Sequence, residues 1–271
     1  MPGKNMDFVV LTNPRSGSYF FIDSLSSTEK IRCHGELFKP NLVELDKEYR
    51  EALDIGKNEV NKRDKSPLKF LGDVYKVSND KAITGFKLFF RHNPVVIDHV
   101  ISNKKIKKII LLRNPVQAYI SLKMAEKSGA WTSKVESNMN HNKILINVYP
   151  LEFRKYCTGL FNIIFGCVYI LEKTKQEYLL LDYLDITTNQ SGLDAAVDFL
   201  GVDQTGTYVS SYKKQIEKSY NDLVENWNDL KIFLDRRGVN ENSCFMDFFS
   251  DWYNISNKDD IFKGKVPVNH I

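Results

Sequence analysis

The residues best suited to chemistry lie near the start of the chain, in the polar loop of residues 14–18 (PRSGS). A short apolar run precedes the loop and apolar residues at helical spacing follow it, so we expect it to join a strand to a helix. Gly17 would let the backbone approach a ligand closely. The amides of Ser16, Gly17 and Ser18 would then point outward at the positive end of the helix dipole. Arg15 adds a guanidinium fork that suits a tetrahedral oxyanion. The alternative is a sharp turn with a solvent-facing arginine.

This loop differs from two common nucleotide-binding motifs. The loop that binds nucleoside triphosphates, G-x-x-x-x-G-K-[ST], requires a lysine after its second glycine, whereas Ser18 and Tyr19 follow Gly17 here. The dinucleotide fingerprint G-x-G-x-x-G is absent as well. The sequence therefore predicts an anion site of a different kind.

A second polar group begins with Arg113, directly after the expected strand 107–112, whose last four residues are apolar. Arg113 would leave the carboxyl end of a buried strand, which is where open α/β sheets bind their ligands. Asn114 is suited to cap a helix that starts at the following proline. Asn114, Gln117 and Ser121 then share one helix face. The alternative is an amphipathic helix whose polar face is only solvated.

The elements that must position these residues follow from hydrophobic periodicity. The expected strands are 8–12, 82–90, 107–112 and 177–182, and the expected helices are 94–101, 115–127, 151–173, 193–200 and 212–234. Strands that alternate with helices indicate an α/β fold with a central parallel sheet flanked by helices. We expect a single domain over residues 1–271, with the lysine-rich stretch 44–69 as an insertion or lid.

Composition excludes several classes of protein. The 271 residues are 42% hydrophobic and 12% aromatic, which is ample for a buried core and excludes intrinsic disorder. The net charge of +4 permits a small anionic ligand but does not indicate a nucleic-acid partner. No signal peptide and no apolar stretch of about 20 residues is visible, so we expect a cytoplasmic protein without a membrane span. The four cysteines are scattered, which indicates neither a disulfide framework nor a metal site.

Taken together, the two arginine segments resemble the sulfotransferase family. The run 14–18 is similar to the family's 5′-phosphosulfate loop, and LRNP at 112–115 with Ser121 is similar to its 3′-phosphate motif. The resemblance implies a sulfotransferase or P-loop-like nucleotide-binding architecture. It also implies transfer of a sulfuryl group from 3′-phosphoadenosine 5′-phosphosulfate (PAPS) to a hydroxyl of a carbohydrate or small metabolite. Adenosine 3′,5′-bisphosphate (PAP) would be the product, and no metal would be needed.

Two shorter runs agree with this resemblance. GFKL at 85–88 is similar to the family's lysine-bearing strand, so Lys87 would approach the sulfuryl oxygens or the acceptor, or simply reach out from a strand end. CHGELF at 33–38 is similar to a segment of bacterial carbohydrate sulfotransferases whose glutamate serves as base. The resemblance therefore implies Glu36 as the base, with a surface carboxylate as the alternative. His34 is the second choice because residues two apart in an extended segment share one face, and a structural histidine is its alternative.

The remaining roles also follow from the family motifs. Arg15, with the four amides that follow it, would stabilise the charge that develops on the leaving nucleotide. Arg113 and Ser121 would hold the 3′-phosphate, which distinguishes this donor from ATP. Lys213 would close over the nucleotide, although such lysines more often belong to a solvated face. Tyr19 departs from the family, which commonly has threonine here, so a phenol is expected beside the acceptor pocket.

Two other functions stay open as alternatives. A nucleotide kinase or NTPase with a degenerate phosphate loop would bind ATP with magnesium, but it requires the lysine that this loop lacks. A non-catalytic module would keep the nucleotide fold and use its surface to bind a partner. The sequence does not decide between a monomer and an oligomer.

Overall fold

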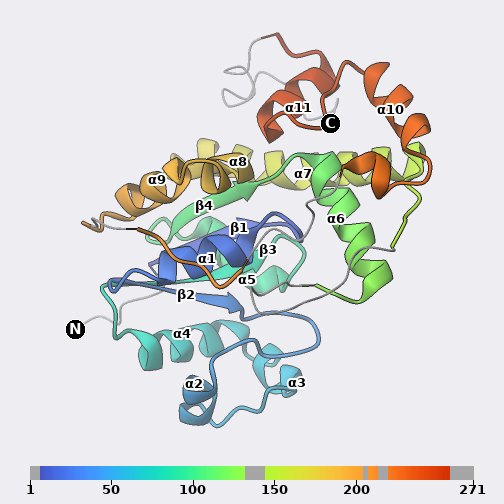
Figure 1. Cartoon of the computed structure of the whole chain (residues 1–271). Coiled ribbons are helices and arrows are strands. Elements are labelled where there is room, and N and C mark those ends of the chain that lie inside the picture. The colour runs from blue at the N-terminus through green and yellow to red at the C-terminus, as the bar shows by residue number, and fades with distance from the viewer. Residues whose placement is uncertain (1–6, 132–143, 204–206, 213–218, 257–271) are drawn as a thin grey trace.

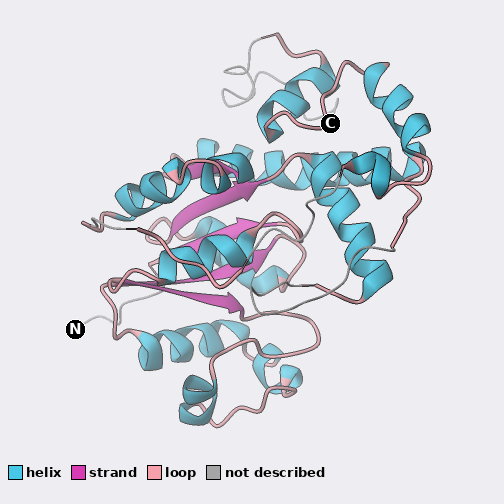
Figure 2. Cartoon of the chain, in the orientation of Figure 1, coloured by secondary structure: helices cyan, strands magenta, loops and turns pink. Residues whose placement is uncertain are grey.

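The computed structural model describes residues 7–131, 144–203, 207–212 and 219–256. Within these residues the centre is a five-stranded parallel sheet in the order β2-β3-β1-β4-β5 (Figures 1 and 2). The strands are β1 (Phe8–Thr12), β2 (Ile31–Glu36), β3 (Ile83–Phe89), β4 (Lys107–Leu112) and β5 (Tyr178–Asp182). The predicted α/β class with a parallel sheet is confirmed.

Helices cover both faces of the sheet (Figure 2). One face carries α1 (Ser18–Ser26), α8 (Tyr183–Thr187) and α9 (Ser191–Leu200). The other carries α4 (Pro67–Ser78), α5 (Pro94–Ser102), α6 (Pro115–Ser128) and α7 (Pro150–Lys173). Outside these lie α2 (Lys47–Ala52) and α3 (Val60–Asp64) beside α4, and η2 (Tyr220–Asp222), α10 (Trp227–Asp235) and α11 (Phe245–Tyr253) near α7. No helix in the described part of the chain is long and apolar enough to cross a bilayer.

Strand β1 lies in the middle of the sheet and is buried on both faces. Phe8 and Val10 pack under α1, α8 and α9, whereas Val9 and Leu11 pack on the opposite face. A central parallel strand needs apolar residues at every position, which is why its sequence has no alternation. Gly85 of β3 pairs with Phe8, and a Cβ at Gly85 would lie 2.5 Å from the Phe8 ring. The absence of a side chain at Gly85 therefore makes room for this ring.

The predicted helix over 212–234 is wrong for most of its length. Residues 213–218 lie outside the described residues, η2 is a single 3₁₀ turn, and α10 covers only the last part of the range. Between η2 and α10 the backbone forms a bridge: Ile146 N–H donates to Leu223 O and Glu225 N–H donates to Ile146 O, both at 2.9 Å. Leu223, Leu230 and Leu234 are buried, but their spacing matched a helix that the bridge interrupts.

Strand β2 was not predicted as a strand, and it contains a β-bulge. His34 pairs with Phe86, whereas Glu36 pairs with Lys87, so the register shifts at Gly35. Because Phe86 and Lys87 point to opposite faces of β3, His34 and Glu36 also face opposite sides of the sheet. The prediction that they share one face is therefore wrong.

The connections of the strands place a switch point between β1 and β4. The chain leaves β1 toward β2 on one side of the sheet, and it leaves β4 toward β5 on the other. The loops that follow these two neighbouring strands therefore diverge at their carboxyl ends. Such a point is where open α/β sheets bind ligands.

We predict that Gly85→Ala lowers the free energy of unfolding by about 2 kcal/mol, because the added methyl would overlap the Phe8 ring. Urea denaturation measures the change. Gly72→Ala is the matched control: its Cβ would meet nothing within 4 Å in α4, so it should add about 0.5–1 kcal/mol. Equal stabilities for Gly85→Ala and the wild type would contradict this close packing of β1 on β3.

Candidate functional site

The carboxyl ends of the five strands surround a cavity of about 740 Å³. Each strand contributes at its end: Arg15 and Gly17 after β1, Glu36 from β2, Phe89 and His92 at β3, Arg113 after β4 and Tyr183 after β5. A parallel sheet brings these ends to a single edge, so residues far apart in sequence meet there.

The loop between β1 and α1 has the geometry of an anion cradle. Arg15 and Gly17 have left-handed backbone angles, φ 69° and 82°, whereas Ser16 between them does not. Such alternation aims successive N–H groups in the same direction. In the described part of the chain, the N–H groups of residues 16–19 donate to no other protein group. A Cβ at Gly17 would lie 2.5 Å from the Tyr183 ring, so only glycine fits there.

The two arginine segments meet at this loop. Arg15 Nε donates to Ser121 Oγ at 2.9 Å, and Arg113 Nη1 donates to the backbone oxygen of Arg15 at 2.9 Å. The Arg15 guanidinium also donates to the carbonyl of Trp131. The Arg113 guanidinium lies over the Tyr183 ring, 4.1 Å from its centroid. The two motifs therefore form one wall of the cavity.

This wall carries two positive charges in a partly buried setting. Burial and the nearby charge of Arg113 lower the pKa of Arg15 to about 10, and burial also lowers the pKa of Arg113. Both groups are therefore still charged at neutral pH. Arg113 forms no ion pair with a carboxylate among the described residues. An anion bound in the cavity would compensate this charge, and the described residues contain no cluster that could hold a metal ion.

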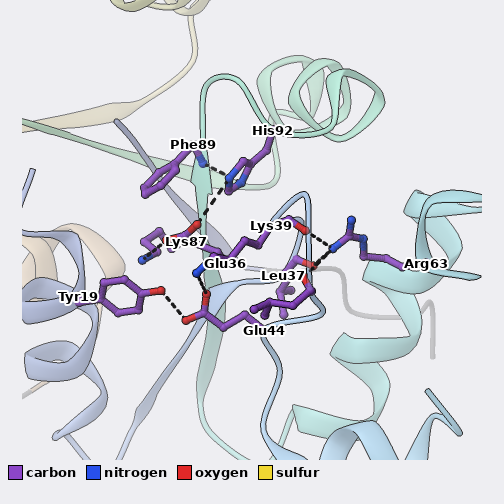
Figure 3. A network of polar contacts seen from close by, with 10 residues as sticks. Tyr19, Glu36, Leu37, Lys39, Glu44, Arg63, Lys87, Phe89 and His92 are labelled. Carbon is purple, nitrogen blue, oxygen red and sulfur yellow. Dashed lines mark hydrogen bonds and ion pairs between the residues drawn. The ribbon is translucent and has the colours of Figure 1, made fainter. Parts of the chain in front are cut away.

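The carboxylate of Glu36 lies in the same cavity and is buried among charged groups (Figure 3). Lys87 Nζ is 3.0 Å from Glu36 Oε1, an ion pair without aligned hydrogen-bond geometry, and His92 Nε2 is 3.6 Å from Oε2. Burial lowers the pKa of Lys87, and the charge of Glu36 opposes that shift. Lys87 Nζ also lies 3.1 Å from the centroid of the Tyr19 ring, and Tyr19 donates its hydroxyl to Glu44 at 2.6 Å.

The structure brings most of the predicted residues to one cavity. Those that line it are Arg15, Gly17, Ser18, Tyr19, Glu36, Arg113 and Ser121. Ser16 does not line it, and its buried hydroxyl accepts a hydrogen bond from Thr12 Oγ1. Lys213 lies outside the described residues. The roles of all these residues stay predictions.

Two further predicted residues do not line the cavity. Lys87 is 0% exposed and lies beneath the Tyr19 ring, so the phenol separates its ammonium from the cavity. His34 faces the opposite side of the sheet, where its Nε2 is 2.8 Å from Ser78 Oγ. As a correction, His34 is not placed where it could serve as base, because the bulge at Gly35 turns it away.

Sequence reasoning missed several residues of the cavity, among them Tyr183, His92 and Tyr212. Tyr183 and His92 follow the carboxyl ends of β5 and β3, so the strand-end rule that selected Arg113 could have found them. Tyr212 lines the cavity and stacks on Tyr19 with the ring centroids 5.3 Å apart. Trp131, which lies after α6, also lines the cavity.

Arg63 of α3 supports one wall of the cavity from behind. Its side chain is buried, at 2% exposure, and Nη1 donates to the backbone oxygens of Leu37, Lys39 and Leu42 at 3.0, 2.8 and 3.1 Å. These carbonyls belong to the segment after β2, which lines the cavity (Figure 3). Part of the stretch 44–69 thus fixes the cavity wall, and its action as a lid stays a prediction.

We predict that stability falls as the pH is lowered from 6.5 to about 4, and that His34 carries much of the loss. Burial, assisted by the charge of Arg32, lowers the pKa of His34 to about 4 in the folded chain, below its ordinary 6.5. The unfolded chain therefore takes up the proton first. The loss amounts to about 3 kcal/mol from this residue, and it is absent above pH 6.5.

Urea denaturation at several pH values, on the wild type and His34→Gln, measures this effect. The variant should be less stable than the wild type at pH 7, and its free energy of unfolding should fall by less when the pH is lowered. Parallel curves for both proteins would contradict a neutral, buried His34. Burial also lowers the pKa of His92 to about 4, so His92 makes the unfolding free energy depend on pH as well. This contribution is similar in the wild type and in His34→Gln, and it cancels when the two curves are subtracted.

Comparison with known proteins gives matches to solved structures only. No protein-family model and no characterised sequence matches the chain. A sulfotransferase from Alicyclobacillus acidocaldarius is 12% identical, with a TM-score of 0.47 over 86% of this chain and 92% of that chain. The sulfotransferase domain of the Synechococcus PCC 7002 olefin synthase is 14% identical, with a TM-score of 0.47 over 94% and 97%. Mouse sulfotransferase SULT7A1 complexed with PAP is 12% identical, with a TM-score of 0.43 over 97% and 90%. At these identities and TM-scores the matches carry no functional argument.

Proposed function

We propose that this chain is a PAPS-dependent sulfotransferase that transfers the sulfuryl group to a hydroxyl of a carbohydrate or small metabolite in the cytoplasm. The observation that carries the proposal is the joined pair of Arg15 and Arg113 in one cavity wall, where Arg113 has no carboxylate partner among the described residues. Two guanidinium groups side by side suit a ligand with at least two negative charges. Glu36 in the same cavity offers a carboxylate as base.

The residues present fit a donor of this kind. The amides of residues 16–19 and Arg15 would hold the 5′-phosphosulfate, because they combine free N–H groups with a helix N-terminus and a guanidinium. Arg113 and Ser121 would hold the 3′-phosphate. The Tyr183 ring beneath Arg113 keeps that guanidinium in place. When bound, PAPS would supply the electron-poor sulfuryl group together with a leaving group that gains negative charge.

Within this proposal, the protein's own residues do three things. Glu36 accepts the proton that the acceptor hydroxyl loses. Arg15 stabilises the negative charge on the leaving side, and it does so as a fixed cation that gives up no proton. The apolar and aromatic residues of the cavity, among them Leu42 and Phe89, exclude water and contact the acceptor.

We predict that PAP raises the thermal stability of the chain and that 5′-AMP does so far less. At 100 times its dissociation constant PAP should add about 2.7 kcal/mol. Differential scanning fluorimetry measures the shift for the wild type and for Arg113→Ala, which should lose the discrimination between the two nucleotides. An equal shift with 5′-AMP, or a shift with ATP that requires Mg²⁺, would contradict the 3′-phosphate site, and the latter would favour a kinase.

We predict that Glu36→Gln lowers kcat for sulfuryl transfer by about 10²- to 10⁴-fold, because the amide accepts no proton. Its affinity for PAP, measured by calorimetry, should stay within about threefold of the wild type, since Glu36 lies outside the arginine wall. Glu48→Gln, an exposed substitution in α2, is the control and should keep full turnover. Full turnover by Glu36→Gln would rule out its role as base, and no turnover by any form would favour a non-catalytic module.

A further inference from the structure

His92 lies in the loop after β3 and faces the carboxylate of Glu36 (Figure 3). Its side chain is only 5% exposed, it lines the cavity, and its ring packs on Phe89 with the centroids 4.9 Å apart. We propose that His92 is a positioning residue for Glu36, which it holds through Nε2–H so that the carboxylate faces the acceptor. This inference rests on the proposed function, because it assigns a partner to the proposed base.

The backbone next to His92 determines which ring nitrogen carries the proton. The N–H of Phe89 donates to Nδ1 of His92 at 3.4 Å. A nitrogen that accepts a hydrogen bond presents a lone pair, so the proton of the neutral ring must be on Nε2. Nε2 is the atom that lies 3.6 Å from Glu36 Oε2. The ring thus offers a donor to the carboxylate.

The surroundings keep this ring neutral at physiological pH. Burial, together with the charges of Lys87, Arg63 and Lys39, lowers the pKa of His92 to about 4, while the charge of Glu44 opposes the shift. A neutral ring with its proton on Nε2 can donate toward Glu36 but has no lone pair on that side. His92 therefore cannot take the acceptor's proton from this position, and Glu36 keeps that role.

Lys87 and His92 divide the two oxygens of Glu36 between them. Lys87 contacts Oε1 at 3.0 Å from the completely buried side, beneath the Tyr19 ring. His92 faces Oε2 and itself lines the cavity. With an ion pair at one oxygen and an imidazole N–H facing the other, the carboxylate is restrained from rotating. The 3.6 Å between His92 Nε2 and Glu36 Oε2 is longer than a hydrogen bond. Catalytic contacts of this kind often shorten when the substrate binds.

The first experiment tests the geometry without any need for activity. Long-range ¹H–¹⁵N correlation spectra of the ¹⁵N-labelled wild type report the tautomer of each histidine, and His92→Gln assigns the signals of His92. We expect the Nε2–H tautomer of His92, persisting down to about pH 5. An Nδ1–H tautomer, or an imidazolium at pH 7, would overturn the proposal.

The second experiment tests the consequence for turnover. In His92→Gln the side-chain amide can present an N–H near the position of Nε2, so kcat should stay within about threefold of the wild type. His92→Ala should lose about 10- to 30-fold in kcat, with its KM for the donor and its affinity for PAP unchanged. His99→Ala on α5 is the matched control and should leave all of these values unchanged.

The outcomes separate this inference from the proposed function. Wild-type kcat in His92→Ala would overturn the positioning role. Equal inactivity of His92→Gln, His92→Ala and Glu36→Gln would instead assign the base to the imidazole, which also overturns it. A wild type that shows the Nε2–H tautomer but transfers no sulfuryl group would overturn the proposed function and not the geometry.

Discussion

The hydrogen bond from the Arg113 guanidinium to the backbone of Arg15 is the interaction on which the arginine wall of the cavity depends. Like charges repel, so the fold must hold Arg15 and Arg113 together by other contacts. It does so with a hydrogen bond from Arg113 to the backbone oxygen of Arg15, which the left-handed backbone of Arg15 makes accessible, and with the Tyr183 ring beneath Arg113. The resulting site is preorganised for an anion, because the repulsion between the charges of Arg15 and Arg113 is already overcome when the chain folds.

The register of the sheet fixes where these two arginines leave it. Thr12 at the end of β1 pairs with Leu111 of β4, and the Thr12 hydroxyl hydrogen-bonds both the Leu111 carbonyl and the Ser16 hydroxyl. The polar contacts tie the first residues of the loop to the neighbouring strand. The loops after β1 and β4 thus start at the same level of the sheet, although they are 98 residues apart at their point of contact.

The sequence predicted the elements whose pattern is local, and it failed where distant contacts decide. β1 and β4 are continuous apolar runs, and the helix after Arg113 begins with an N-cap and a proline, so each could be recognised alone. The bulge in β2 depends on pairing with β3, and the bridge at Ile146 replaces a helix whose spacing looked regular. His92 acquires its place only from the fold. Residue type alone favoured His34, which the bulge turns toward Ser78.

Tyr19 explains how the charges of the cavity are kept apart. The Arg15 and Arg113 wall carries two positive charges, whereas the Glu36–Lys87 pair is neutral as a unit. Without the Tyr19 ring between them, the ammonium of Lys87 would also attract an anion bound in the cavity. It would then no longer be paired with the Glu36 carboxylate alone. The Tyr19 ring covers that ammonium, and its hydroxyl is fixed by Glu44. The Tyr19 ring therefore leaves Lys87 facing the Glu36 carboxylate, and under the proposed function the arginine wall would bind the donor while Glu36 would face the acceptor.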